Sequence, residues 1–391
     1  MLPVVLGCVM GASAFGVDSL LPALPELAAH FSITPTASQM AVTFSLIGFG
    51  IGQLPVGLLA DRHGRRVTAL VCLCAYILGG LAGAAAPSIE AVYGARLIQG
   101  MGAAGLGVAA RAIVRDVASG DRAGRIMSGA ISFMGIVTIA APIVGGTLVT
   151  LGSWRTVMLG IAAYGLMALG LALLFFPSYQ RQKSPRTAMQ QLKASFHAFL
   201  ASPRSLFATV LFTVLFSGIF VFVTTGSTLA FEFYGLSQGV TGWMVALIAA
   251  SYMTGAATNH QLVERWGLYR MLALSVGLIA LAGIGLLALS FWADVPMPVL
   301  WSMIMLYGVG FGIAMPTLTA IVMDPLPEFA AFATSIVGTV QSIGAAAVSG
   351  TAAALYTGTP RSLCLLMGVA GLLGLTIHWL GKGTLTRPQP H

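Results

Sequence analysis

The sequence predicts an all-α integral membrane protein with twelve transmembrane helices in two six-helix bundles. Of the 391 residues, 57% are hydrophobic and only 8% are charged, whereas a soluble domain carries about 25% charged residues. Twelve apolar stretches approach or exceed the length of about 20 residues that a helix needs to cross a bilayer. A basic stretch separates the first six from the last six, which predicts two bundles.

The first six predicted spans lie between charged or turn-rich segments. They cover residues 3–28, 38–60, 67–86, 90–110, 126–149 and 155–176. Together they form a predicted N-terminal bundle, residues 1–176. A basic linker is predicted to follow at residues 177–205.

The second set of six spans repeats this pattern. It covers residues 206–230, 240–261, 270–291, 299–322, 330–353 and 361–381. These spans form a predicted C-terminal bundle, residues 206–381. Residues 382–391 remain as a polar tail.

The positions of Lys and Arg predict that both termini lie in the cytoplasm. With the N-terminus inside, 16 of the 19 Lys and Arg residues fall in inner connections, the linker or the tail. Arg155 and Arg361 fall in outer connections, and Arg96 lies within a span. Cytoplasmic loops of membrane proteins carry such an excess of basic residues. This placement explains the net charge of +8 without a nucleic-acid partner.

The two halves of the sequence resemble each other. Asp-Arg-His-Gly at residues 61–64 lies between the second and third spans, and Glu-Arg-Trp-Gly at residues 264–267 lies between the eighth and ninth. Related six-helix bundles are expected to rock about a binding site near the middle of the membrane.

Three motifs resemble those of the major facilitator superfamily. Residues 57–66 resemble its loop motif after the second span, and residues 96–102 (Arg-Leu-Ile-Gln-Gly-Met-Gly) resemble its fourth-span motif. Pro142 with Gly145 and Gly146 resembles the fifth-span motif associated with antiporters. Residues 18–25, 111–116 and 234–237 look like the Bcr/CflA branch of twelve-span drug:proton antiporters. The resemblance covers essentially the whole chain.

The resemblance implies a major facilitator fold, with two bundles related by pseudo-two-fold symmetry, in a bacterial inner membrane. It implies a monomer that exchanges protons for small lipophilic or amphipathic compounds, including antibiotics, by alternating access. The expected partners are the substrate, protons and the lipid bilayer. Such a protein is not an enzyme and needs no cofactor, because the proton gradient drives it. The sequence has no nucleotide-binding glycine loop followed by Lys and no His or Cys cluster with metal-ligand spacing.

Other functions remain open on the same scaffold. One is proton-coupled export of a specific metabolite, such as an amino acid or a sugar. Another is proton-coupled uptake. A membrane receptor that transports nothing is a further alternative.

Asp18 and Arg96 are the predicted proton-coupling residues. Asp18 follows 17 uncharged side chains and is expected within the bilayer, where a charged residue costs about 2.5–3.5 kcal/mol. Burial disfavours the charged form of a carboxyl, as a proton carrier requires. Arg96 keeps its charge and needs a polar partner. Because the resemblance places the first and fourth spans at the cavity, Asp18 is the expected partner.

Each of these two residues also has a structural interpretation. Asp18 is alternatively a hydrated residue at the outer end of the first helix, before Pro22. Arg96 is alternatively a static anchor for backbone carbonyl groups of that helix.

Twelve residues are predicted to control the conformational change. The resemblance implies a cytoplasmic latch at residues 57–66, where Asp61 accepts hydrogen bonds from a helix N-terminus. Pro142 lacks a backbone donor, and the glycines that follow it allow close helix packing. The predicted gating residues are Gly57, Asp61, Arg62, Gly64, Arg65, Arg66, Arg111, Arg115, Asp116, Pro142, Gly145 and Gly146.

Large, adaptable side chains are expected to line the substrate cavity. They come from spans that the resemblance places around it. The predicted substrate-binding residues are Phe15, Asp18, Gln99, Met134, Phe220, Tyr252, Tyr307, Met315 and Gln341. Taken singly, each of these residues other than Asp18 and Gln99 is better explained by helix packing or lipid contact than by contact with a ligand.

Overall fold

The computed structural model describes residues 1–391 except 118–119, 177–195, 327–329 and 387–391. The described residues form helices and connecting turns, with no strand among them. They divide into two compact units, one made of Met1–Ala188 and Leu236–Ala246, the other of Met189–Gly235 and Leu247–His391. The start of the eighth span therefore belongs to the first unit. The predicted domain limits differ, because they place the whole eighth span in the C-terminal bundle.

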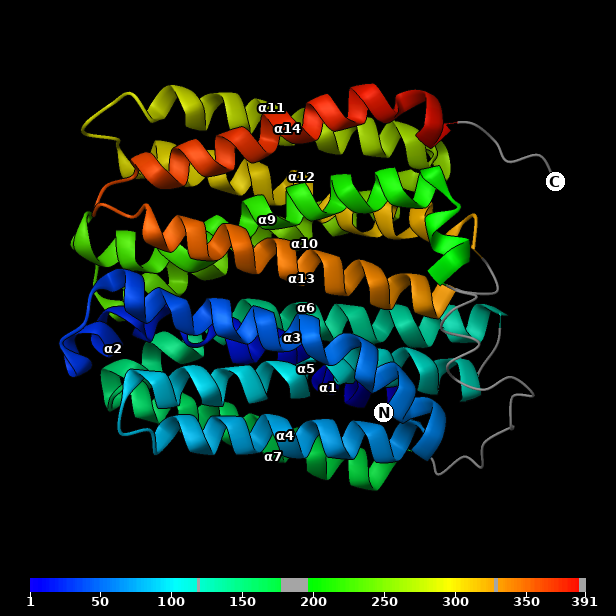
Figure 1. The fold of residues 1–391 in the computed structure, drawn as a ribbon, viewed down its shortest axis with the longest axis horizontal. Helices are drawn as coiled ribbons and strands as arrows, with labels where there is room; N and C mark the ends of the chain where they lie inside the picture. Colours follow the sequence, from blue (N-terminus) through cyan, green and yellow to red (C-terminus); the bar gives the residue numbers. More distant parts are fainter. Residues whose placement is uncertain (118–119, 177–195, 327–329, 387–391) are drawn as a thin grey trace. The chain divides into compact units, whose positions relative to one another are not determined.

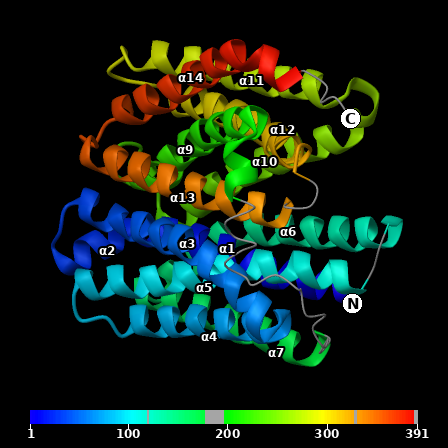
Figure 2. The ribbon, with the colours of Figure 1, turned by 45° about the vertical axis from the view of Figure 1, so that its right-hand side comes forward.

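The first unit holds the first six predicted spans. Its helices are α1 (Leu2–Asp18), η1 (Leu21–Ala23), α2 (Leu24–Phe31), α3 (Pro35–His63), α4 (Arg65–Ala84), α5 (Ile89–Val117), α6 (Gly120–Leu151) and α7 (Trp154–Phe175). Helix α5 packs against both α3 and α4, α1 packs against α6, and α4 lies beside α7 (Figures 1 and 2). The first span is interrupted at η1 because Pro22 and Pro25 lack the N–H groups that a continuous helix needs.

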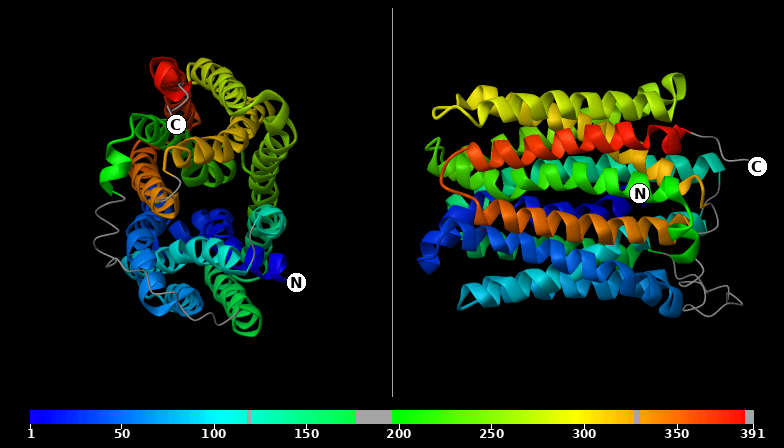
Figure 3. Two further views of the ribbon diagram at one scale, coloured as in Figure 1. Left: turned by 90° about the vertical axis from the view of Figure 1, so that its right-hand side faces the viewer. Right: turned by 45° about the horizontal axis from the view of Figure 1, so that its top comes forward.

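The second unit holds the last six predicted spans, except for the part of the eighth within Leu236–Ala246. Its helices are α9 (Pro203–Glu232), α10 (Gln238–Trp266), α11 (Leu268–Leu289), α12 (Met297–Met323), α13 (Ala330–Ala354) and α14 (Arg361–Thr386). Helix α9 packs against α13 and α14, while α11 packs against α12 and α14. Within each unit the helices run side by side along their length (Figure 3). Helix α14 continues past residue 381, so residues 382–386 of the predicted tail are helical.

The helices have the length and surface of membrane spans. Ten helical stretches among the described residues are long and apolar enough to cross a bilayer. Helices α3 and α5, each 29 residues long, pack against these and complete twelve. Leu78 on α4, Leu166 on α7 and Leu281 on α11 are each more than half exposed, as expected for side chains that face lipid.

The predicted internal repeat has a structural counterpart in two glycines. Gly64 begins α4 with φ 86° and ψ 160°, and Gly267 begins α11 with φ 76° and ψ 160°. Only glycine adopts this backbone conformation readily. The same turn therefore introduces the third helix of each bundle.

Helix crossings repeat as well. In the first unit, Gly48 of α3 lies against the Leu97 carbonyl group of α5, and Gly100 of α5 lies against the Ser45 carbonyl group of α3. In the second unit, Gly255 of α10 and Gly312 of α12 make the corresponding pair of contacts, with the carbonyl groups of Val309 and Tyr252. Reciprocal glycines thus bring the second and fourth helices of each bundle into backbone contact.

Candidate functional site

Asp18 is the last residue of α1, immediately before the break at η1. With a rise of about 1.5 Å per residue, it lies about 24 Å along the helix from Leu2, which is less than the hydrocarbon thickness of about 30 Å. Its side chain is partly exposed rather than enclosed. Gly7 and Gly11, which precede Asp18 by three and two turns on the same side of α1, both pack against α6. Asp18 therefore shares the side of α1 that faces α6.

Arg96 lies on α5 and is enclosed by the first unit, with 1% of its surface exposed. Its Nη1 donates to Oε1 of Gln99, one turn further along the same helix. Its Nε and Nη2 have no hydrogen-bond partner among the described residues, and the same holds for Nε2 of Gln99. The carbonyl oxygen of Gln99 is thus engaged by Arg96, while its amide nitrogen keeps an unused donor.

The expected Asp18–Arg96 ion pair is not formed, because among the described residues the guanidinium of Arg96 bonds to Gln99 alone. The cause lies in the geometry of α1. Gly16 lies against the hydroxyl of Tyr76, a buried side chain of α4. One turn further along α4, Gly79 lies against Gln99, the hydrogen-bond partner of Arg96. Residues 16 and 18 point about 200° apart around a helix. Asp18 and the Arg96 neighbourhood therefore lie on opposite sides of α1.

Two further predicted residues of the first unit lie on α1 and α6. The ring of Phe15 stacks on that of Tyr164 of α7 at 4.4 Å between centroids and is largely buried. Met134 of α6 is partly exposed, and its backbone lies next to Gly7. Phe15 therefore packs α1 on α7, and Met134 is the more accessible of the two.

In the second unit, an aromatic cluster joins α9, α10 and α12. Phe216 and Phe220 lie 4.7 Å apart, and Phe311 contacts both Phe216 and Tyr252 at 5.9 and 5.8 Å between ring centroids. The Tyr252 hydroxyl donates to the Met315 sulfur at 2.6 Å. Three predicted residues, Phe220, Tyr252 and Met315, thus meet in one cluster whose side chains are mostly partly exposed.

Tyr307 and Gln341 lie in different surroundings. Tyr307 is fully buried and donates to the Leu215 carbonyl oxygen at 3.1 Å, so it packs α12 on α9 and offers no free hydroxyl to a ligand. Gln341 of α13 is 8% exposed, and its Nε2 has no partner among the described residues. Gln341 therefore keeps an unused donor.

The loop motif at residues 57–66 is described in part. Gly64 has the left-handed conformation that ends α3 and starts α4, and Arg66 donates from Nη2 to the Leu173 carbonyl oxygen of α7 at 2.7 Å. Arg65 also belongs to the first turn of α4. For the other predicted gating residues outside α6, the structure describes the helical backbone alone: Gly57, Asp61, Arg62, Arg111, Arg115 and Asp116.

Pro142 lies inside α6, and its glycines permit two close approaches. A Cβ on Gly145 would overlap the Ser19 carbonyl oxygen, directly after Asp18. Gly146 faces the Gln238 carbonyl oxygen, and Gly242 faces the Pro142 carbonyl oxygen, within the part of α10 that belongs to the first unit. This segment of α6 thus touches both the end of α1 and the start of α10 through backbone.

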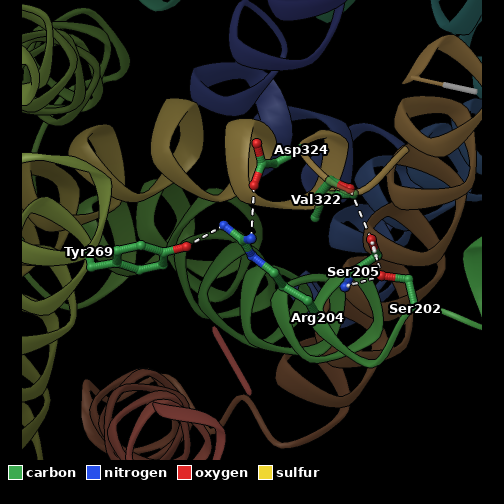
Figure 4. A network of polar contacts seen from close by, with 6 residues as sticks. All are labelled: Ser202, Arg204, Ser205, Tyr269, Val322 and Asp324. Atoms are coloured by element: carbon green, nitrogen blue, oxygen red, sulfur yellow. Dashed lines mark hydrogen bonds and ion pairs between the residues drawn. The ribbon is translucent and has the colours of Figure 1, made fainter. Parts of the chain in front are cut away.

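A polar network joins three helix ends of the second unit (Figure 4). Arg204 of α9 pairs with Asp324 at 2.8 Å and donates to the hydroxyl of Tyr269 at the start of α11. Ser205 donates to the Val322 carbonyl oxygen of α12 at 3.0 Å and is itself held by the capping residue Ser202. These six residues form the Arg204 clamp: Ser202, Arg204, Ser205, Tyr269, Val322 and Asp324.

Sequence reasoning missed three residues of these clusters. Phe216 lies one turn before the predicted residue Phe220, and Phe311 lies one turn before the predicted residue Met315. This spacing of four residues places each pair on one side of a helix and could have identified them. The sequence signal for Tyr76 was weaker, since it consisted only of a polar hydroxyl in the middle of an apolar helix. Among the described residues, no group of three or more potential metal ligands lies together.

Comparisons with known proteins are consistent with this arrangement. The Major Facilitator Superfamily model matches residues 6–349. The chain is 25% identical to the bicyclomycin resistance protein homolog of Haemophilus influenzae over 389 residues, which covers 96% of this chain and 94% of the relative. It is 27% identical to multidrug resistance protein D of Escherichia coli over 376 residues, covering 93% and 91%. The fold is similar to the xylose transporter XylE of E. coli in a partially occluded inward open conformation, with a TM-score of 0.75, 16% identity and 97% coverage of both chains.

Proposed function

Because this chain belongs to the Major Facilitator Superfamily, we propose that it is a proton-coupled antiporter that exports small lipophilic or amphipathic compounds across the bacterial inner membrane. Its relatives include proteins named for bicyclomycin and multidrug resistance, which supports drugs and antibiotics as substrates. In this proposal the protein works as a monomer with both termini in the cytoplasm. The proton gradient drives it without a cofactor.

The proposed proton coupling rests on the position of Asp18. It is a carboxyl group within the membrane thickness, partly exposed, with no ion-pair partner among the described residues. An unpaired carboxyl in an apolar environment is stabilised by binding a proton. Asp18 is therefore suited to take up a proton from the outer side and to release it inside when substrate binds.

The aromatic cluster of the second unit supports the substrate class. Phe216, Phe220 and Tyr252 offer ring faces, and Met315 offers a flexible thioether. Such surfaces bind apolar and planar groups and adapt to ligands of different shape. A site specific for a sugar or an amino acid would instead need several fixed hydrogen-bond donors and acceptors.

The segment around Pro142 supports an alternating-access cycle. Backbone contacts of α6 with Ser19 and with Gly242 connect the end of α1 to the start of α10. Because these contacts contain no bulky side chain, small sliding motions there meet little steric resistance. We assign this segment to the conformational change that follows protonation of Asp18.

The test is substrate-induced proton movement in liposomes that contain the purified protein and a pH-sensitive dye. Bicyclomycin and the lipophilic cation tetraphenylphosphonium serve as probes. Wild-type protein should move protons in the direction opposite to the probe. Asp18→Asn should lose this proton movement, whereas Asp294→Asn, a matched change at an exposed residue between α11 and α12, should retain it.

Each result has a distinct meaning. Proton movement in the same direction as the probe would identify a symporter. Proton exchange with an amino acid or a sugar but with neither probe would identify a metabolite exporter. Full proton coupling in Asp18→Asn would show that Asp18 is not the proton carrier.

A further inference from the structure

Tyr76 occupies a space that three other helices leave for it. Gly16 of α1 lies against its hydroxyl, Gly165 of α7 against its ring, and Gly102 of α5 against its backbone. A Cβ at any of these glycines would lie within 3.0 Å of a Tyr76 atom. The ring is 1% exposed. The first unit therefore fixes a phenol group at the junction of α1, α4, α5 and α7.

This phenol is the one available hydrogen-bond acceptor among the unpartnered atoms near Arg96. Those atoms are Nε and Nη2 of Arg96, Nε2 of Gln99 and the hydroxyl of Tyr76. Guanidinium and amide nitrogens only donate, whereas a phenol oxygen both donates and accepts. The Oε1 of Gln99 already accepts from Arg96. Tyr76 is therefore the group on this side of α1 that can hold the rest of the guanidinium.

We propose that Tyr76 is a positioning residue that, together with Gln99, retains Arg96 on the side of α1 opposite Asp18 and so keeps Asp18 unpaired. The inference rests on the antiport proposed above and deepens it. If Arg96 were released, it would be attracted to the one carboxyl of α1. The pair would hold Asp18 in its charged form and oppose proton uptake.

Other charged and titratable groups near Asp18 are few. Helix α6 carries none between residues 126 and 151. On α1 and its continuation these groups are Cys8, Glu26 and His30. On the other helices packed against them they are Asp61, Arg62, His63, Glu90, Tyr93, Arg96, Arg111, Arg115, Asp116, Arg155 and Tyr164. Arg111, Arg115 and Asp116 lie at least 15 residues further along α5 than Arg96. Tyr164 is engaged with the Cys8 carbonyl oxygen at 2.9 Å, and Arg155 with His30 at 2.9 Å. Arg96 is thus the cation available to pair with Asp18.

The experiment measures the pH dependence of Asp18 modification by dicyclohexylcarbodiimide, which reacts with protonated carboxyl groups. Modification of the purified full-length protein is quantified by mass spectrometry. Tyr76→Phe keeps the ring but removes the hydroxyl, and it should move the labelling midpoint of Asp18 to lower pH by about one unit or more, because a nearby cation stabilises the carboxylate. Tyr164→Phe removes another hydroxyl that contacts α1, that bonded to the Cys8 carbonyl oxygen, and it should leave the midpoint unchanged.

Two further variants separate positioning from damage to the fold. Gln99→Met should shift the midpoint in the same direction, because it removes the oxygen that accepts a hydrogen bond from Arg96 in this structure. In the double variant Tyr76→Phe, Arg96→Gln, the midpoint should lose the downward shift, because the released cation is absent. An unchanged midpoint in both Tyr76→Phe and Gln99→Met would overturn the proposal, as would a downward shift that persists without Arg96.

This assay requires no transported compound. Failure of the antiport proposal appears in the liposome experiment as the absence of proton exchange in wild-type protein. Failure of the Tyr76 proposal appears here as an unchanged or Arg96-independent labelling midpoint. The two outcomes are therefore distinguishable.

Discussion

Gly145 lies where α6 touches the end of α1. The atom that a side chain would meet there is a backbone oxygen, that of Ser19, which cannot rotate away as a side chain can. The contact also lies directly after the proposed proton carrier, Asp18. A single methyl group at this position therefore acts on both packing and proton coupling.

Gly145→Ala is expected to destabilise the protein by about 1–3 kcal/mol, the usual effect of overpacking, and to reduce transport. The measurement is the unfolding temperature of the detergent-solubilised protein, followed by proton exchange in liposomes. Gly170→Ala is the matched control, because a Cβ at Gly170 of α7 meets no atom within 4 Å. Equal unfolding temperatures for the two variants would contradict this account of Gly145.

At the residue scale, the sequence indicated which charged residues lie within the membrane better than it indicated which residues they contact. Asp18 was identifiable because a carboxyl in an apolar run is costly wherever its neighbours lie. Whether Asp18 pairs with Arg96 was not predictable, since it depends on which side of α1 each of the two residues faces. Tyr76 was missed because its surroundings come from Gly16, Gly102 and Gly165 on three different helices.

At the scale of elements, the Arg204 clamp connects the start of α9 with the start of α11 and the end of α12. Its two charged side chains differ in environment. The side chain of Arg204 is 8% exposed, whereas that of Asp324 is 57% exposed. Water can replace a lost partner at Asp324 but has little access to Arg204, so the two residues should contribute unequally.

Arg204→Ala is expected to cost about 2 kcal/mol of stability, because it removes a charged hydrogen-bond donor from the clamp. Asp324→Asn should cost less than about 1 kcal/mol, since the exposed ion pair is weak and the amide oxygen still accepts. Unfolding in detergent at increasing temperature gives the ranking. A larger loss for Asp324→Asn would mean that the ion pair dominates the clamp.

Most limits of the elements were predictable to within about three residues, but α5, α6, α10 and α14 each run five to seven residues beyond the predicted span, and the first span is broken. The first span was predicted as one helix although Pro22 and Pro25 lie within it, and the structure places η1 there. Helix α14 runs to Thr386 because a helix need not end where the apolar stretch ends. Apolar runs indicate membrane crossing, while backbone hydrogen bonding decides where a helix breaks.

At the scale of the molecule, twelve helices and their internal repeat agree with the sequence analysis. Composition and spacing sufficed for this because both reflect the solvent, lipid or water, that each segment meets. The inclusion of residues 236–246 in the first unit was not predictable. It results from contacts of Gly242 and Gln238 with α6, which carry no periodic signal.

The basic residues predict the orientation of the whole chain in the membrane. Asp294→Cys, between α11 and α12, should react with a membrane-impermeant maleimide in intact cells. Arg265→Cys, between α10 and α11, should react only after the membrane is permeabilised. Both changes are made with the exposed Cys74 replaced by Ser. The reverse pattern would place both termini outside.

The reciprocal glycines at the α3–α5 and α10–α12 crossings have a consequence for the history of the sequence. Relatives named for drug resistance share only 25% and 27% of their residues with this chain, so most positions have diverged. Gly48, Gly100, Gly255 and Gly312 each leave no room for a Cβ beside a carbonyl group of the partner helix. Across aligned homologues these four positions should change more slowly than the lipid-facing leucines, and a substitution at one member of a pair should accompany a change in its partner.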